Sequence, residues 1–215
     1  MTKIIRKNGV KAMGHIHHFD QMAAKYDTTR NKDMAKRSAD AIRSLMDKNH
    51  TKTAVDLGCG TGNVGFHLLD DFESMLFVDA SSKMIAQVKS KLADMGTKKA
   101  SVLCLDIEKN VQLPYKADTI ILSLVLHHIS DSHKLLSTLY DALNEEGQLL
   151  IIEMEKPKKK SSSHGHGFDR SLLADALAEI GFQNIQSEIF YDAEQMQDAQ
   201  GVSRFVLSAR KNIIE

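Results

Sequence analysis

The chain has 215 residues, a length typical of one domain with room for a small appendage. It carries 28 Lys and Arg against 28 Asp and Glu, and this zero net charge argues against a protein whose main partner is a nucleic-acid backbone. The hydrophobic share of 42% and the charged share of 26% exclude disorder as the main state and fit a chain with a sizeable core.

Signals for export or membrane insertion are missing from the sequence. No apolar run approaches the ~20 residues that cross a bilayer, and residues 1–14 lack the apolar stretch of a secretory signal. The two cysteines, Cys59 and Cys104, form neither a CxxC pair nor a disulfide-rich pattern. We therefore expect a cytoplasmic protein in a reducing compartment.

Apolar patterning predicts the order of the elements. Two helices, at 16–26 and 33–47, precede the core, so we expect an N-terminal helical appendage or lid at 1–48 and a core domain at 49–215. Short apolar runs predict strands at 53–57, 75–79, 101–105, 119–125, 148–153, 185–191 and 203–209. Amphipathic stretches predict helices up to about 71, at 81–95, around 135–143 and at 168–180.

The alternation of strands and helices predicts an α/β fold with a doubly wound, mostly parallel sheet. The strands are continuous apolar runs, as expected when helices cover both faces. Residues 156–167 are basic and then rich in Ser and Gly, which indicates a loop. Its lysines, Lys158 to Lys160, are most simply solvated.

A glycine-rich loop, Gly58 to Gly62, follows the first strand and opens a helix. Glycines at this place let a ligand approach the backbone closely. Gly60, Gly62 and Gly65 also fit the GxGxxG pattern, with Asp79 about 20 residues on as a dinucleotide site requires. A nicotinamide-dependent oxidoreductase is therefore one alternative.

Three carboxylates at successive strand ends favour a different ligand. Asp56 comes immediately before the glycine loop, where it suits an ammonium or sulfonium group and repels a pyrophosphate. Asp79 can accept hydrogen bonds from both hydroxyls of a ribose, and Asp106 from the exocyclic amine of adenine. Amine, ribose and adenine occur together in S-adenosylmethionine.

Over roughly residues 26–209 the chain resembles the class I S-adenosylmethionine-dependent methyltransferases. The resemblance rests on VDLGCGTG at 55–62, FVDASSKM at 77–84, LDIE at 105–108 and DTIILSLVLHHI at 118–129. It implies a Rossmann-like seven-stranded sheet of order 3-2-1-4-5-7-6. One departure is Glu145-Glu146-Gly147, where the family commonly has proline and glycine.

The resemblance also implies S-adenosylmethionine as cofactor and S-adenosylhomocysteine as product. Asp79 would hold the ribose, Met84, Asp106 and Ile107 would lie at the adenine, and Cys59 would be a small packing residue. The full set of implied cofactor contacts is Tyr26, Asp56, Gly58, Cys59, Gly60, Asp79, Ala80, Met84, Asp106, Ile107 and Ser123.

Methyl transfer needs a general base only if the acceptor is protonated. His127 and His128, just beyond the fourth strand, are the candidates for a base or substrate contact. The alternative is that one caps the following helix and the other packs. No metal site is expected, because His15, His17, His18, His164 and His166 are accompanied by no Cys or carboxylate set at ligand spacing.

The residues after the fourth predicted strand indicate the class of methyl acceptor. Ser123-Leu124-Val125-Leu126 replaces the [ND]PP[YF] motif of enzymes that methylate base nitrogens, so DNA is not expected as substrate. The spacing F-D-x-x-A-x-x-Y-D from Phe19 to Asp27 resembles the lid helix of small-molecule methyltransferases. We expect a small-molecule acceptor; an RNA or protein acceptor and a non-catalytic S-adenosylmethionine-binding protein stay open, as does the oligomeric state.

Overall fold

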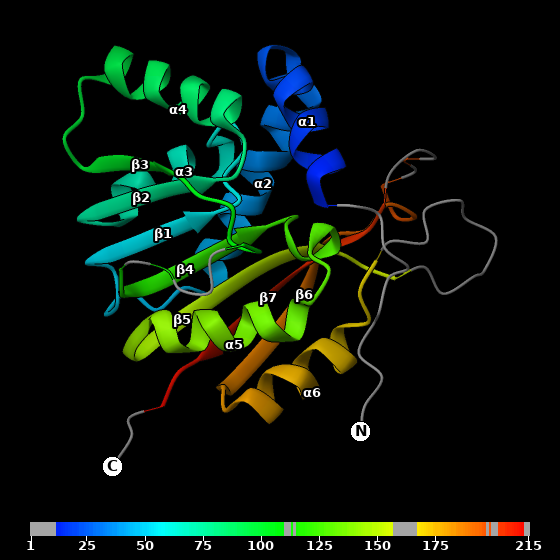
Figure 1. Ribbon diagram of the computed structural model, residues 1–215. Coiled ribbons are helices and arrows are strands. Elements are labelled where there is room, and N and C mark those ends of the chain that lie inside the picture. The colour runs from blue at the N-terminus through cyan, green and yellow to red at the C-terminus, as the bar shows by residue number, and fades with distance from the viewer. Residues whose placement is uncertain are drawn as a thin grey trace.

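The computed structural model describes residues 12–109, 113, 115–156, 167–196, 198 and 202–212, with side chains from Ile16 onward (Figure 1). The sequence-based expectations for His15, Lys158 to Lys160, His164 and His166 concern side chains outside these described ranges.

The described residues form a seven-stranded sheet of order β3-β2-β1-β4-β5-β7-β6, as the resemblance implied. Its strands are β1 (Thr53–Leu57), β2 (Ser74–Asp79), β3 (Ala100–Cys104), β4 (Ala117–Ser123), β5 (Leu143–Met154), β6 (Gln183–Tyr191) and β7 (Arg204–Arg210). The first five are mutually parallel, whereas β7 runs antiparallel to both β5 and β6.

Helices cover both faces of the sheet (Figure 1). The helices are α1 (Ala12–Met22), α2 (Thr29–Leu45), α3 (Asn63–Leu68), α4 (Ser82–Met95), α5 (Ser132–Ala142) and α6 (Arg170–Ile180), with single 3-10 turns η1 (Ala23–Lys25), η2 (Leu69–Asp71) and η3 (Leu126–His128). None of the described helices is long and apolar enough to span a membrane.

Strand alternation divides the buried side chains between two core layers. On β4, Ile121 faces the layer formed by α2, α3 and α4, whereas its neighbours Ile120 and Leu122 face α5 and α6. The same alternation runs along β5, where Leu150 and Leu149 lie on opposite faces. Both faces are apolar, which explains why the strands appear in the sequence as continuous hydrophobic runs.

Three elements begin four or more residues earlier than the sequence patterns predicted. Helix α1 starts at Ala12 rather than at residue 16. Helix α2 starts at Thr29 rather than at residue 33, because the side chain of Thr28 accepts a hydrogen bond from the Asn31 N–H and caps it. Strand β5 starts at Leu143 rather than at 148, with a register shift between its pairings to Ala117 and Thr119. The atypical turn at Glu146, which has φ +59°, lies within this irregularity.

The sheet order places a crevice at the carboxyl ends of β1 and β4. The chain leaves β1 toward β2 on one side and returns through β4 on the other, so the loops after these two strands diverge. Strand β7 runs the opposite way and begins at this same edge, where Arg204 pairs in register with Met154 of β5. Side chains from β1, β2, β3, β4 and β7 can therefore meet there.

The first glycine of the loop after β1 is required by both conformation and space. Gly58 has φ +70°, and a Cβ there would lie 2.5 Å from a methyl of Val125. We expect Gly58→Ala to lower the free energy of unfolding in urea by about 2–4 kcal/mol, because overpacking adds to the left-handed strain. Gly96→Ala is the control, since Gly96 has φ +63° but open space around a Cβ. Equal losses in the two variants would contradict the role of the contact with Val125.

Candidate active site

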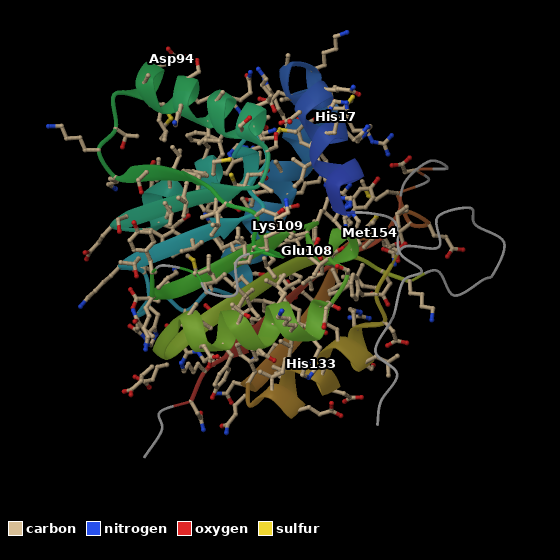
Figure 2. The ribbon with its side chains drawn as sticks, in the orientation of Figure 1. His17, Asp94, Glu108, Lys109, His133 and Met154 are labelled. Carbon is tan, nitrogen blue, oxygen red and sulfur yellow. The ribbon has the colours of Figure 1, made fainter. Side chains whose placement is uncertain are left out.

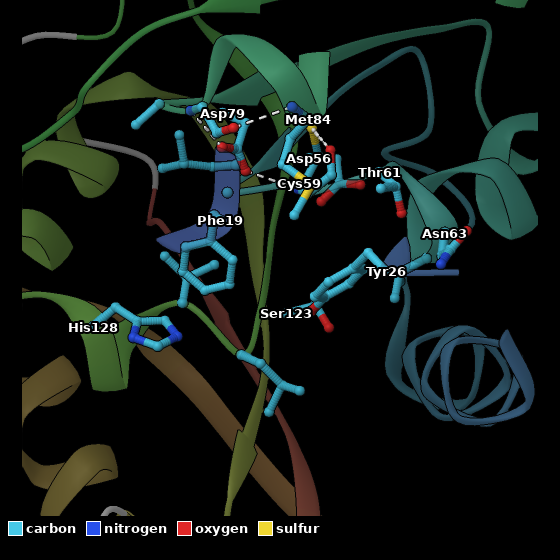
Figure 3. Close-up of a pocket in the computed structure, with 18 of the residues that line it drawn as sticks. Phe19, Tyr26, Asp56, Cys59, Thr61, Asn63, Asp79, Met84, Ser123 and His128 are labelled. Atoms are coloured by element: carbon cyan, nitrogen blue, oxygen red, sulfur yellow. Dashed lines mark hydrogen bonds between the residues drawn. The ribbon is translucent and has the colours of Figure 1, made fainter. Parts of the chain in front are cut away.

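A cavity of about 340 Å³ opens at the carboxyl edge of the sheet (Figure 3). Every residue that the sequence analysis proposed as a cofactor contact or as a base lines it. These residues are Tyr26, Asp56, Gly58, Cys59, Gly60, Asp79, Ala80, Met84, Asp106, Ile107, Ser123, His127 and His128. The structure thus brings together residues from positions 26 to 128, whereas their individual roles stay predictions.

Asp79 joins the glycine loop to the start of α4. One carboxylate oxygen accepts the Gly60 N–H at 2.8 Å and the other accepts the Ser81 N–H at 2.8 Å. Burial raises the pKa of Asp79, and these two N–H donors oppose that rise. Each carboxylate oxygen has a second lone pair, so the group can still accept hydrogen bonds from a ligand's two hydroxyls.

Asp56 is a nearly inaccessible carboxyl at the floor of the cavity, with 1% of its surface exposed. Burial, and then the charge of Asp79, raise the pKa of Asp56 to about 7, while the Gly65 N–H acts in the opposite direction. Its Oδ2 atom has no hydrogen-bond partner among the described residues. A ligand ammonium would supply the missing charge and donors, so this site fits the amine end of S-adenosylmethionine.

The adenine side of the predicted site is formed by α4 and by the segment after β3. Met84 is buried there, with its N–H capped by the Ser81 hydroxyl. Asp106 forms a 2.9 Å ion pair with Lys109 and accepts the Glu108 N–H. Figure 2 shows Glu108 and Lys109 side by side at this edge of the sheet.

The segment between α1 and α2 is tied to the glycine loop by Asp27. Its carboxylate pairs with Lys91 at 2.7 Å and accepts hydrogen bonds from Thr61 at 2.6 Å and Asn63 at 2.8 Å. The adjacent Tyr26 ring thereby lies over the loop, 4.0 Å from where a Cβ of Gly60 would be. The structure therefore fixes Tyr26 at the cavity independently of any ligand.

The two histidines after β4 have different environments. Nδ1 of His127 lies 3.0 Å from an oxygen of Glu153, which is fully buried at the end of β5. The ring of His128 packs edge-on against Phe19 of α1, with centroids 5.2 Å apart (Figure 3). Neither histidine caps α5, because Asp131 occupies that position. The capping alternative is therefore wrong.

Cys59 is a protonated thiol in this setting. Burial first, and then the charges of Asp56 and Asp79, raise the pKa of the thiol well above its usual value. A protonated thiol is a poor nucleophile, in agreement with the prediction that Cys59 packs. Among the described residues, no group of His, Cys, Asp and Glu side chains could hold a metal ion, and His17 lies on α1 bonded to Gln21 (Figure 2).

Several cavity residues were not identified from the sequence. They include Asn31, Met34 and Ser38 of α2, Met154 of β5 and Arg204 of β7, whereas Phe19 belongs to the predicted lid helix. Glu153, behind His127, was missed too. The available signal for Glu153 was an acidic residue ending an otherwise apolar strand, QLLIIE.

The sheet order, the glycine loop and the strand-end carboxylates define the fold and site of a class I S-adenosylmethionine-dependent methyltransferase. Residues 55–149 match the family model described as "Methyltransferase domain". The match spans β1 to β4 with the glycine loop and supports S-adenosylmethionine as the cofactor.

Some of the similar proteins are named methyltransferases. The chain is 32% identical to an uncharacterised Haemophilus influenzae protein over 132 residues, 60% of this chain and 52% of that one. It is 28% identical to the ubiquinone/menaquinone biosynthesis C-methyltransferase UbiE of Marinomonas, covering 80% of this chain and 70% of that protein. A solved S-adenosylmethionine-dependent methyltransferase from Aquifex aeolicus shares the fold, with a TM-score of 0.68, 16% identity, and coverage of 89% and 97%. The chain spans about half the length of the first curated relatives it matches.

Because Asp56 titrates near neutrality, its substitution should affect stability in a pH-dependent way. Its folded-state pKa of about 7 exceeds that of an unfolded aspartate, ~3.9. Between these values the native state binds more protons than the unfolded state, so the group's contribution to stability falls as pH rises through this window. We therefore expect Asp56→Asn to stabilise the ligand-free protein more at pH 8 than at pH 5. The difference in the free energy of unfolding between variant and wild type should be about 1–4 kcal/mol larger at pH 8.

Urea denaturation at pH 5 and pH 8 measures this difference. Asp70→Asn is the matched control, because the Asp70 side chain is fully exposed and should show no such dependence. A pH-independent effect of Asp56→Asn would contradict the buried, titrating carboxyl.

Asp79 should control cofactor affinity. We expect Asp79→Ala to weaken S-adenosylhomocysteine binding about 100-fold or more, because it would remove the two predicted charge-assisted hydrogen bonds to the ribose as well as the anchor of Gly60. Asp79→Asn should lose less, since one amide oxygen can still accept. Calorimetric titration measures both, and wild-type affinity in Asp79→Ala would exclude the ribose role.

Proposed function

We propose that this protein transfers the methyl group of S-adenosylmethionine to a small organic acceptor. The observation that carries the proposal is a single cavity that extends from the strand-end carboxylates, past His127 and His128, to side chains of α1 and α2. Its lining includes the apolar side chains of Ile16, Phe19 and Met154. Such a lining suits a small molecule better than a polymer backbone.

The chain's own residues would position the reactants. When bound, S-adenosylmethionine supplies a methyl group on a sulfonium, which already carries an excellent leaving group. Asp56 would pair with the ammonium group, Asp79 would hold the ribose, and Asp106, Met84 and Ile107 would enclose the adenine. Alignment of the acceptor and exclusion of water are then the main tasks left to the protein.

His127 is the candidate base for an acceptor that must lose a proton. Its Nδ1 faces the Glu153 carboxylate, which accepts hydrogen bonds only, so Nδ1 carries the proton and Nε2 is the basic atom. The acceptor's lone pair would form the new bond to the methyl carbon as its proton passes to Nε2. The electron pair of the broken carbon–sulfur bond would stay on sulfur.

The N-terminal residues 1–48 would act as a lid for this cavity. Asp20 of α1 accepts a hydrogen bond from the Ser81 hydroxyl at 2.5 Å, and Phe19 contacts His128. Through these two contacts α1 lies beside both the cofactor side and the acceptor side of the cavity. A lid over a small-molecule site in the cytoplasm is the arrangement that we infer.

Binding and turnover assays test this proposal. Calorimetric titration should show micromolar binding of S-adenosylhomocysteine and none of NADH. Purified protein with S-adenosylmethionine and a metabolite library should then methylate a small compound, detected by mass spectrometry. Methylation of RNA or protein alone, or cofactor binding without transfer to any class of acceptor, would replace the proposal by one of those alternatives.

Glu153 is expected to act as a positioning residue for His127. We expect Glu153→Gln to lower kcat about 10- to 100-fold for an acceptor that loses a proton, with unchanged S-adenosylhomocysteine affinity. Glu153→Asp should recover part of the loss, because it restores the charge.

Glu155→Gln is the matched control, since Glu155 pairs with Arg170 and does not line the cavity. Wild-type kcat in both Glu153→Gln and His127→Gln would remove the pair from the mechanism.

A further inference from the structure

Arg204 is the one Lys or Arg among the described residues that line the cavity. It is the first residue of β7 and pairs in register with Met154 of β5 and Tyr191 of β6, so its backbone is held from both sides. A permanent positive charge is thus fixed at the wall of a cavity whose other charged residues are carboxylates and titratable histidines.

The guanidinium of Arg204 has no ion pair with any described carboxylate. Its Nε atom is buried and lacks a hydrogen-bond partner among the described residues. Four other described arginines behave differently. Arg30, Arg43, Arg170 and Arg210 each pair with an aspartate or glutamate. Glu153, whose charge acts on Arg204, is paired with His127 instead.

Burial makes this lack of a partner energetically unfavourable. Desolvation, together with the neighbouring charge of Arg30, lowers the pKa of Arg204, although Tyr26, Tyr191 and Glu153 act in the opposite direction. Arg204 is partly buried, with Nε itself inaccessible, and a cation in such a place without hydrogen-bonded counter-charge is stabilised by a ligand or an ion pair. An oxyanion fits a guanidinium particularly well, because two parallel N–H groups can bind two oxygens.

The sheet order places the backbone of Arg204 away from the predicted cofactor half, although its charge acts on Tyr26, a predicted cofactor contact. Three strand steps, β1 to β4 to β5 to β7, separate it from Asp56, which is about 14 Å at the usual strand spacing. Asp79 and Asp106 lie in the opposite direction, at β2 and after β3. His127, the candidate base, lies between the two halves.

We propose that the methyl acceptor carries a carboxylate or phosphate group and that Arg204 binds it. This proposal rests on the proposed function and adds the chemical class of the substrate. An anionic group at Arg204 would hold the rest of the acceptor against the apolar wall formed by Met34, Phe19 and Met154, with its reacting atom toward His127. The anionic group would also supply the negative counter-charge that Arg204 lacks among the described residues.

Simple aromatic probes test the proposal on the protein saturated with S-adenosylhomocysteine. Benzoate and phenyl phosphate supply the two oxyanions, and benzamide and phenol are their neutral counterparts. We expect calorimetry to detect the anions and not the neutral probes, with the tighter anion identifying the group. Arg204→Gln should weaken anion binding about tenfold or more.

Arg30→Gln is the matched control. It removes the same charge close to Arg204, but Arg30 is largely exposed, pairs with Asp198 and does not line the cavity. We expect less than about a twofold change in anion affinity, because an exposed pair contributes little. Arg204→Lys should give an intermediate loss, and it serves as the test variant if thermal melting shows that Arg204→Gln does not fold.

Three results would overturn the assignment. Equal affinity of wild-type protein for anionic and neutral probes would exclude an anionic acceptor. Equal losses in the variants of Arg204 and Arg30 would make the effect one of net charge alone. Weaker binding of S-adenosylhomocysteine but not of methylthioadenosine, which lacks the amino-acid portion, in Arg204→Gln would place the guanidinium on the cofactor's carboxylate. Failure of wild-type protein to bind S-adenosylhomocysteine would instead contradict the proposed function itself.

Discussion

The rest of the site depends on one interaction, the pair of hydrogen bonds that the Asp79 carboxylate accepts. One comes from Gly60 in the loop after β1 and the other from Ser81 at the start of α4. They fix two loops from neighbouring strands relative to each other, and the loop backbone is further held by Gly58 and Cys59 donating to the Val78 carbonyl. Because the acceptor is a carboxylate, the same group that shapes the site also faces the cavity with unused lone pairs.

The charges of the cavity are divided between its two halves. On the β1–β2 side, Asp56 is buried and Asp79 is partly buried. The two carboxylates are close enough for the charge of one to affect the other, and this repulsion is unfavourable without a cation. On the β7 side, Arg204 is partly buried, with a buried Nε and no ion pair to a described carboxylate. A cationic cofactor beside an anionic acceptor would relieve both costs at once. These uncompensated charges lower the folding stability of the ligand-free protein and favour ligand binding, as is common at functional sites.

The sequence could predict the half of the site that local patterns encode. Asp56, Asp79 and Asp106 are found by one rule, since each follows a short apolar strand and parallel strands end at one edge. The sheet order came from family resemblance, because strand spacing alone does not specify it. Residues such as Arg204 and Ser38 carry no such signal. Their place at the cavity depends on the register of β7 with β5 and on the packing of α2, which are long-range properties.

The N-terminal segment connects the two halves of the cavity through a short stretch of chain. Asp27 is bonded to Thr61, Asn63 and Lys91 of the cofactor side, while Phe19, eight residues earlier, contacts His128 beside the proposed base. Most of these contacts are polar and at least partly exposed, so they stabilise the segment far less than the two apolar layers stabilise the sheet. Displacement of this segment would therefore open the acceptor side of the cavity. The sheet and the two hydrogen bonds that Asp79 accepts from Gly60 and Ser81 would stay intact. Such a division of stability is what an enzyme needs if its acceptor must enter and leave a site whose cofactor contacts, apart from Tyr26, stay in place.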